Sequence, residues 1–328
     1  MATQARTMPL EELVPTPERF DNADRLLTRL REDPLSSGNW IFRGQRKSTW
    51  SLLSTLERFE HEIGAVPTGR TEKASLTDFQ RHAHHFHQNL PATDDVLEWL
   101  SLMRHHGSPT RLVDFTRSPY VAAFFATAEA DPNEGGAIWA IDSKALEHYA
   151  AIVISHETMS VRFGDFARRY LAPQPVNRPR LSFSDPEFIK AIDPNTTYGP
   201  YPAAVVPVEP IRMNERMRRQ QGLFLLKTSP FASFENSLKA VMKQAKEAQV
   251  TAPIVHKLII QPTAYLDVLH ELVRMNINYD TLLPGLDGLA LSFQMRMRLE
   301  YGQYWRARNQ PSIAQPGSPS ASEQQSCD

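Results

Sequence analysis

The stretch from residue 104 to residue 130 constrains the fold most, because a dense polar segment runs directly into an apolar helix. Ten of the residues from 104 to 116 are polar or turn-forming. Residues 118–130 then begin with Ser-Pro, which suits an N-cap and a first helical position, and continue as an apolar run. A buried polar group without a partner costs about 1–3 kcal/mol. Four polar side chains are therefore expected to be held in hydrogen bonds or to face a ligand: Thr110, Arg111, Asp114 and Thr116.

The composition allows a substantial hydrophobic core and gives no global attraction to polyanions. The chain has 328 residues, of which 41% are hydrophobic and 22% charged, and its formal net charge is -1 at pH 7. This length fits one large domain or two small ones. The near-neutral charge removes the global electrostatic case for nucleic acid or an anionic membrane, although it leaves room for a local basic groove. Specificity must therefore come from a site.

Cysteine usage and the N-terminal sequence predict a protein of a reducing compartment. The single cysteine, Cys327, excludes an intramolecular disulfide and a cysteine-based metal site. Residues 1–20 lack the apolar core of a signal peptide. The longest apolar run, within residues 120–128, is far shorter than the about 20 residues of a membrane-spanning helix. We therefore predict a cytoplasmic protein without a membrane segment.

Helical and extended patterns alternate irregularly along the chain, which favours an α+β fold over a doubly wound sheet. We expect helices over residues 21–32, 72–89, 94–106, 118–130, 235–248, 263–275 and 286–299, a turn or short helix over 214–220, and strands over 40–44, 110–115, 135–142, 203–208, 223–227 and 254–260. The proline-rich stretch 173–202 is expected to be a long loop. The tail 309–328 is rich in Ser, Pro and Gln and is expected to be disordered.

The first polar segment is a strand exit that carries Arg43, Gly44 and Gln45. The planar fork of an arginine suits a phosphate or a carboxylate, so a phosphate-bearing ligand is the functional interpretation of Arg43. The alternative is a structural ion pair with a carboxylate. Gly44 would let either a ligand or another segment of backbone approach closely.

The second segment contains Arg111 and Asp114, which are three residues apart and could pair with each other instead of facing a ligand. A carboxylate at a strand exit also often holds a loop through backbone donors. His106 in the same segment could donate a proton near neutral pH, because an unperturbed histidine has a pKa of about 6.5, or it could brace the loop.

The third segment places Arg216 and Gln220 just before the strand expected at 223–227. A glutamine amide both donates and accepts, which suits a ribose hydroxyl, but it cannot act as a general base. Its structural alternative is a turn-stabilising amide. The four histidines within residues 82–87 spread around a helix and match no metal-binding spacing, so we predict no metal site.

These three segments together resemble the signature blocks of the FRG domain family. The blocks are WIFRGQ at 40–45, RHHGSPTRLVDFTRSPYVAAFFA at 104–126, and the segment at 216–224, in the same order as in the family. Residues 257–290 resemble its C-terminal element. Family members usually carry Gln at the position of Arg104 and often Trp at that of Phe115. The resemblance implies the following organisation: an N-terminal helical segment at 1–35, an FRG domain at 36–295, a helix end at 296–308 and a disordered tail at 309–328.

The order of these elements is also similar to the ADP-ribosyltransferases, which bind NAD in a cleft of a split sheet. This likeness implies a mixed or split sheet with flanking helices, NAD as a substrate and no required cofactor. Arg43 would hold the pyrophosphate or ribose, Gln220 would stand where Glu is usual, and Asp114 would supply the carboxylate. The candidate nucleotide-binding residues are Arg43, Gln45, Thr110, Arg111, Thr116 and Ser118, and the candidate catalytic residues are Arg43, Asp114, Gln220 and His106.

Three functions are compatible with this sequence. The first is an NAD-consuming ADP-ribosyltransferase or NAD glycohydrolase that acts on NAD and on a protein or nucleic-acid target, as a toxin or phage-defence effector. The second is a non-catalytic nucleotide-sensing or protein-interaction module in which the three segments bind a phosphate ligand. The third is an RNA nuclease with His106 as the acid and Arg43 as the phosphate clamp. All three predict a phosphate-bearing ligand, and none predicts a membrane partner.

Overall fold

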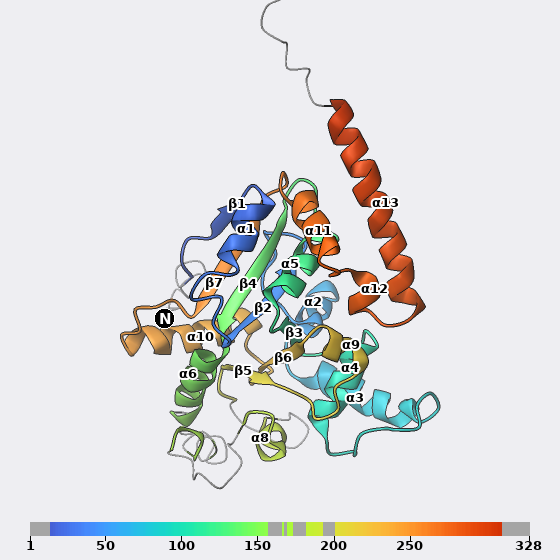
Figure 1. Ribbon diagram of the computed structural model, residues 1–328. Coiled ribbons are helices and arrows are strands. Elements are labelled where there is room, and N and C mark those ends of the chain that lie inside the picture. The colour runs from blue at the N-terminus through green and yellow to red at the C-terminus, as the bar shows by residue number, and fades with distance from the viewer. Residues whose placement is uncertain (1–13, 157–165, 167–168, 173–181, 193–200, 310–328) are drawn as a thin grey trace, which may run out of the picture.

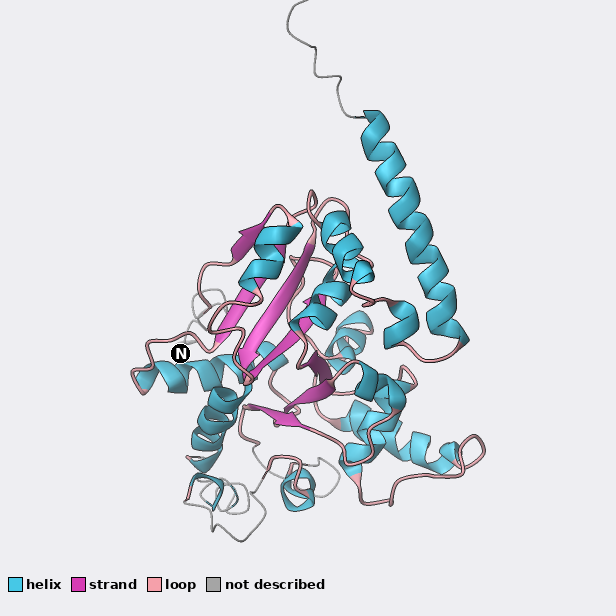
Figure 2. Cartoon of the chain, viewed as in Figure 1, coloured by secondary structure: helices cyan, strands magenta, loops and turns pink. Residues whose placement is uncertain are grey.

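The computed structural model describes residues 14–156, 166, 169–172, 182–192 and 201–309. It contains a seven-stranded sheet in the order β1-β7-β4-β2-β3-β6-β5, with helices against both faces (Figures 1 and 2). The strands are β1 (Glu18–Phe20), β2 (Trp40–Gln45), β3 (Leu112–Thr116), β4 (Gly136–Asp142), β5 (Val205–Val208), β6 (Gly222–Lys227) and β7 (Val255–Ile260). β1 pairs with β7 in parallel and the other neighbours are antiparallel. The predicted α+β class with a mixed sheet is therefore confirmed.

The sheet has a weak junction between β2 and β3. These two strands share one pair of facing residues, Phe42 and Thr116, whereas β2 shares six pairs with β4 and β3 shares five with β6. Figure 2 shows that the strands on the two sides of this junction run in different directions. The junction therefore leaves room for side chains between β2 and β3.

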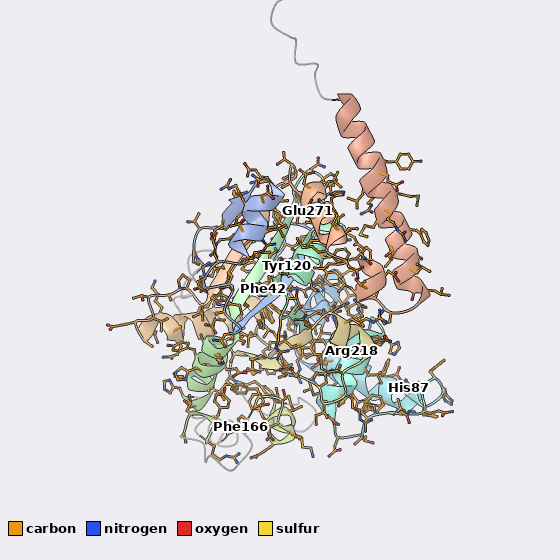
Figure 3. The ribbon with its side chains drawn as sticks, in the orientation of Figure 1. Phe42, His87, Tyr120, Phe166, Arg218 and Glu271 are labelled. Carbon is orange, nitrogen blue, oxygen red and sulfur yellow. The ribbon has the colours of Figure 1, made fainter. Side chains whose placement is uncertain are left out.

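The helices cover two separate cores. They are α1 (Ala23–Arg29), α2 (Thr55–Glu62), α3 (Arg70–Ala83), α4 (Val96–His105), α5 (Pro119–Thr127), α6 (Ser143–Ser155), α8 (Pro186–Ala191), α9 (Glu215–Arg219), α10 (Phe234–Glu247), α11 (Tyr265–Arg274), α12 (Tyr279–Leu282) and α13 (Leu286–Asn309). Side chains alternate across β2, so Phe42 packs under α5 and α11 while Ile41 packs on the opposite side with α4, α6 and α10. Figure 3 labels Phe42 near the middle of the molecule.

Close packing of α5 on β2 explains Gly44. A Cβ atom on Gly44 would lie 2.0 Å from the carbonyl oxygen of Ala122 and 2.6 Å from the amide nitrogen of Ala126. No side chain fits at that distance, so glycine is required by the backbone of α5. Of the two roles that the sequence allows for Gly44, close approach of another backbone is the one observed.

Several elements differ from their predicted form. Helix α8 lies inside the stretch 173–202 that was predicted to be a loop, and the loop prediction is wrong there because Pro186 occupies the first turn behind an Asp185 N-cap. Helix α3 ends at Ala83, so most of the histidine cluster lies beyond it. Helices α2, α6 and α12 and the short strand β1 were not predicted. Of the tail predicted at 309–328, Asn309 is the last residue of α13, and residues 310–328 lie outside the described residues.

Helix α13 continues to Asn309, ten residues beyond the helix predicted at 286–299 and one beyond the helix end predicted at 296–308. Figure 1 shows it extending away from the sheet and its helices. No helix among the described residues is both long enough and apolar enough to cross a membrane.

Candidate functional site

A cavity of about 600 Å³ opens at the junction between β2 and β3. Its walls come from β2, β3, α5, the start of α2, the α9 segment and α12, so segments from across the chain converge on it. The sequence-predicted residues Arg43, Asp114 and Gln220 all line this cavity. Because α5 packs on one face of β2 and Asp114 lies on its neighbour β3, the cavity reaches across the weak junction.

An arginine cluster surrounds Asp114 at one end of the cavity. Arg104 Nε donates to both carboxylate oxygens, at 3.2 and 3.0 Å, and its Nη2 pairs with Oδ2. Arg43 Nη1 donates to the backbone carbonyl of Asp114 at 2.7 Å and lies 3.6 Å from the carboxylate. Arg43 is the more enclosed of the two, with 15% of its side chain exposed. Asp114 is therefore held between two guanidinium groups.

These contacts change the acidity of the groups at this end. Burial lowers the pKa of Arg43 to about 10, although the Asp114 carboxylate opposes this change. Burial alone would raise the pKa of Asp114, but the guanidinium of Arg104, followed by those of Arg43 and Arg216, outweighs it and lowers this pKa below its usual value. Asp114 is consequently ionised at neutral pH and is a poor proton acceptor.

Arginines exceed carboxylates at this end of the cavity. Arg58 and Arg216 are exposed side chains that also line it. Among the described residues neither forms an ion pair with a carboxylate, and Arg58 donates instead to the carbonyl of Leu53 at 2.8 Å. Burial and the positive charge of Arg104 lower the pKa of Arg58. A second anion would therefore be attracted to this end.

The opposite end of the cavity carries a different set of groups. Glu129 accepts a hydrogen bond from the hydroxyl of Tyr279 at 3.1 Å and one from Arg46 at 3.3 Å. The guanidinium of Arg46 lies over the ring of Trp50, 4.9 Å from its centroid. All four residues line the cavity, and none of them was selected from the sequence. Glu129 belongs to no recognisable motif. It follows Phe125, the last apolar residue of α5 that faces the cavity, by four residues, and this spacing is the sequence pattern from which it could have been predicted.

Most predicted polar residues near Asp114 support the cavity wall. The amide of Gln220 donates to the carbonyl of Leu282 at 3.1 Å, and the backbone carbonyl of Gln220 accepts from the hydroxyl of Thr116 at 2.6 Å. Ser118 caps α5 by accepting from the backbone of Val121. These bonds join β3 to α9 and α12, so they fix the wall in place.

Gln45 is also held by the fold, although it lines the cavity. Its amide nitrogen donates to the carbonyl of Ser51 at 3.1 Å, and its oxygen accepts from the indole of Trp139 at 2.8 Å. Both ends of this side chain therefore have protein partners.

Thr110 and Arg111 lie away from the cavity. Arg111 is 1% exposed, and its Nε lies 3.0 Å from a carboxylate oxygen of Glu72 in an ion-pair contact that lacks hydrogen-bond alignment. Its Nη1 donates to the carbonyl of Ile192 at 3.1 Å. Thr110 is fully buried and its backbone bonds to Thr55. Arg111 therefore pairs with Glu72 instead of Asp114.

His106 lines a second, mostly apolar cavity beside α3 and does not line the cavity of Arg43. Burial, followed by the positive charges of His106 and Arg216, lowers the pKa of the neighbouring His105. Figure 3 shows His87 at the surface beyond α3, apart from the sheet. Among the described residues, no group of three or more His, Cys, Asp or Glu side chains is placed to hold a metal ion.

Residues 38–135 match the FRG domain family. This chain contains an FRG domain. The matched residues carry both cavity-lining strands β2 and β3, helix α5, and the cluster of Arg43, Arg104 and Asp114. The FRG match lies within the domain predicted at 36–295, and the rest of that extent stays a prediction. No curated protein and no solved structure matches the chain.

Proposed function

We propose that the FRG domain binds a phosphate-bearing nucleotide in the cavity between β2 and β3. The observation that carries this proposal is the excess of guanidinium groups around Asp114, where Arg58 and Arg216 line the cavity without a carboxylate partner among the described residues. Guanidinium groups present paired donors that match phosphate oxygens. Asp114 neutralises one charge of the cluster and leaves the others for a ligand.

The shape of the cavity supports a nucleotide over an isolated anion. A volume of about 600 Å³ is within the usual range of small-molecule sites, which is about 300–1,000 Å³. Aromatic side chains, among them Trp50 and Phe125, line it beyond the arginine cluster. An inorganic phosphate would fill the arginine end alone, whereas a nucleotide would also contact this aromatic part.

A catalytic form of this function is cleavage of NAD. In that reaction nicotinamide leaves with the electrons of its bond to ribose, and water or an acceptor group bonds to the ribose carbon and releases a proton to solvent. The weak junction in the sheet, with one residue pair between β2 and β3, favours this candidate because the ADP-ribosyltransferases bind NAD in such a split. The carboxylate of Asp114 contacts two arginines, whereas that of Glu129 contacts one. Glu129 is therefore the cavity carboxylate with fewer charged partners.

An NAD-consuming FRG domain would act as a toxin or phage-defence effector through loss of cellular NAD or modification of a protein or nucleic acid. Incubation of the purified chain with NAD, followed by chromatography of nicotinamide, separates this role from that of a sensing module. Nicotinamide release supports the enzyme, and tight NAD binding without release supports the non-catalytic module.

The third candidate function, an RNA nuclease, has less support. It needs His106 and Arg43 in one site, and these residues line different cavities.

Isothermal titration with inorganic pyrophosphate, ADP and GDP tests nucleotide binding. Arg216→Ala is expected to weaken binding of all three about tenfold, which corresponds to about 1.4 kcal/mol. Arg218→Ala is the matched control, because Arg218 is an exposed arginine on the same helix that does not line the cavity (Figure 3). An equal loss of affinity in both variants would show that general surface charge, and not a contact in the cavity, causes the effect. No binding of any of the three ligands to the wild-type chain would refute the proposal.

A further inference from the structure

The cavity has two chemically different ends, and helix α5 sets the distance between them. Val121 and Phe125 share one face of α5, and Glu129 follows four residues later, two residues beyond the end of this helix; all three line the cavity. With a rise of 1.5 Å per residue, the helical part from Val121 to Thr127 covers about 9 Å, and Glu129 lies two residues further along the chain. Thr116 lies just before this helix, so Val121 marks the Asp114 end.

Strand β2, together with the next residue Arg46, gives a comparable separation independently. Phe42 faces Thr116 at the Asp114 end, and Arg46 pairs with Glu129 at the other end. Four residues of extended chain cover about 13 Å. The two ends are therefore separated by a distance that a nucleotide can span from its phosphates to its base, and they are too far apart for one phosphate group.

Glu129 is fixed in position yet still able to accept hydrogen bonds. Tyr279 is 6% exposed and donates to one carboxylate oxygen, while Arg46 contacts the other. A carboxylate offers about four lone-pair sites, so these two contacts leave about two sites free. The Glu129 side chain is 48% exposed. Burial and the charge of Glu129 raise the pKa of Tyr279, so its hydroxyl stays protonated and remains a donor.

We propose that Glu129 is the specificity-determining residue of this cavity, and that it accepts hydrogen bonds from paired donors at the non-phosphate end of the bound nucleotide. Two parts of a nucleotide present such paired donors. The Watson–Crick edge of guanine has adjacent N–H groups, and ribose has neighbouring 2′ and 3′ hydroxyls. The exposed ring of Trp50 offers an aromatic face beside this end, against which a flat base can stack.

This inference rests on the nucleotide-binding function proposed above, and its test separates the two. Titration of the full chain with GDP, 2′-deoxy-GDP, ADP and inorganic pyrophosphate compares ligands that share phosphates but differ at the other end. The wild-type chain is expected to bind GDP at least tenfold more tightly than pyrophosphate. A preference for GDP over 2′-deoxy-GDP assigns the donors to the sugar, whereas a preference for GDP over ADP assigns them to the base.

Glu129→Gln is the decisive variant, because it keeps the size of the side chain and replaces one acceptor oxygen with a donor. It is expected to bring GDP affinity down to that of pyrophosphate, a loss of about tenfold or more, and to leave pyrophosphate affinity within about twofold of wild type. Tyr279→Phe removes the supporting hydroxyl but keeps the carboxylate, so this control is expected to retain at least part of the preference for GDP.

Three outcomes overturn the inference. If Glu129→Gln binds GDP as tightly as the wild-type chain, Glu129 does not contact the ligand, although the proposed nucleotide binding stands. If the variant loses affinity for GDP and for pyrophosphate equally, Glu129 affects the structure of the whole cavity and not one end of the ligand. If the wild-type chain binds GDP no more tightly than pyrophosphate, the far end of the cavity contributes nothing. If the wild-type chain binds none of pyrophosphate, ADP and GDP, the proposed function itself is refuted.

Discussion

Two arginine–carboxylate pairs lie near β3, one buried in the protein and the other beside a cavity. The side chains of Arg111 and Glu72 are 2% and 3% exposed, and Arg111 also donates to the carbonyl of Ile192. Asp114 is 46% exposed, lines a cavity and lies among arginines that outnumber it. The first pair is isolated from water and holds α3 to the strand, whereas the second can exchange partners with a ligand. The same residue types therefore serve the fold in one place and offer a binding site in the other.

The largest effect on stability is expected at the isolated pair. Arg111→Met would leave the Glu72 carboxylate buried without its cation, and removal of one partner from a buried pair costs about 3–5 kcal/mol. Urea denaturation of the wild-type and variant chains measures this change. A loss below about 1 kcal/mol would show that Glu72 finds another partner or reaches water, and the contrast between the two pairs would disappear.

A smaller loss of stability and a loss of binding are expected together at Arg43. Arg43→Lys keeps the charge but loses the fork that contacts both the backbone and the carboxylate of Asp114, which costs about 1–3 kcal/mol. We also expect weaker pyrophosphate binding. Arg218→Lys is the control, since Arg218 is exposed, does not line the cavity, and a surface substitution usually changes stability by less than about 0.5 kcal/mol. Thermal denaturation and titration of both variants provide the comparison.

Arg104 is expected to have a modest effect on stability and a clear effect on Asp114. The ion pair of Arg104 with Asp114 is partly exposed, so Arg104→Gln should cost about 1 kcal/mol or less. Because Arg104 is the main cation that lowers the pKa of Asp114, this pKa should rise in the variant. An NMR titration of the Asp114 carboxyl measures the change. An unchanged pKa would mean that Arg43 alone controls the carboxylate.

The smallest effect is a dependence of stability on pH. The pKa of Asp114 is lower in the folded chain than the about 3.9 of an unfolded aspartate. Its ionised form therefore stabilises the fold above pH of about 4, and this contribution is lost as the pH falls through the lowered pKa. Asp114→Asn removes the contribution, so the difference in melting temperature between wild type and variant should shrink below pH 4. A difference that stays constant from pH 7 to pH 3 would contradict this assignment.

Local sequence patterns were sufficient for the central elements of the fold. The Ser-Pro start and apolar run predict α5, and the apolar residues before Arg43 predict β2, because both signals lie within a few neighbouring residues. Helix α8 was missed because its proline is at the first turn, where it favours a helix. Strand β1 is three residues long and depends on its pairing with β7, which no local pattern reveals.

Some residues of the cavity were also predictable, because local sequence patterns mark them. Arg43, Asp114 and Gln220 each stand beside a strand end with turn residues, a pattern that marks polar groups needing partners. Arg111 could have been separated from Asp114, because residues three apart on extended chain point to opposite sides. Glu129 and Tyr279 come together only through the packing of α5 against α12 and α13, so their role required the tertiary structure.

The central claim is that the arginines around Asp114 serve a ligand while Arg111 serves the fold. The most direct test is the melting temperature of the Arg58→Ala/Arg216→Ala double variant with and without inorganic pyrophosphate. At 100 times its dissociation constant, a ligand stabilises the folded chain by about 2.7 kcal/mol, which raises the wild-type melting temperature by several degrees. We expect the double variant to melt like the wild type without pyrophosphate and to show no rise with it. A double variant that is stabilised as much as the wild type would contradict the account.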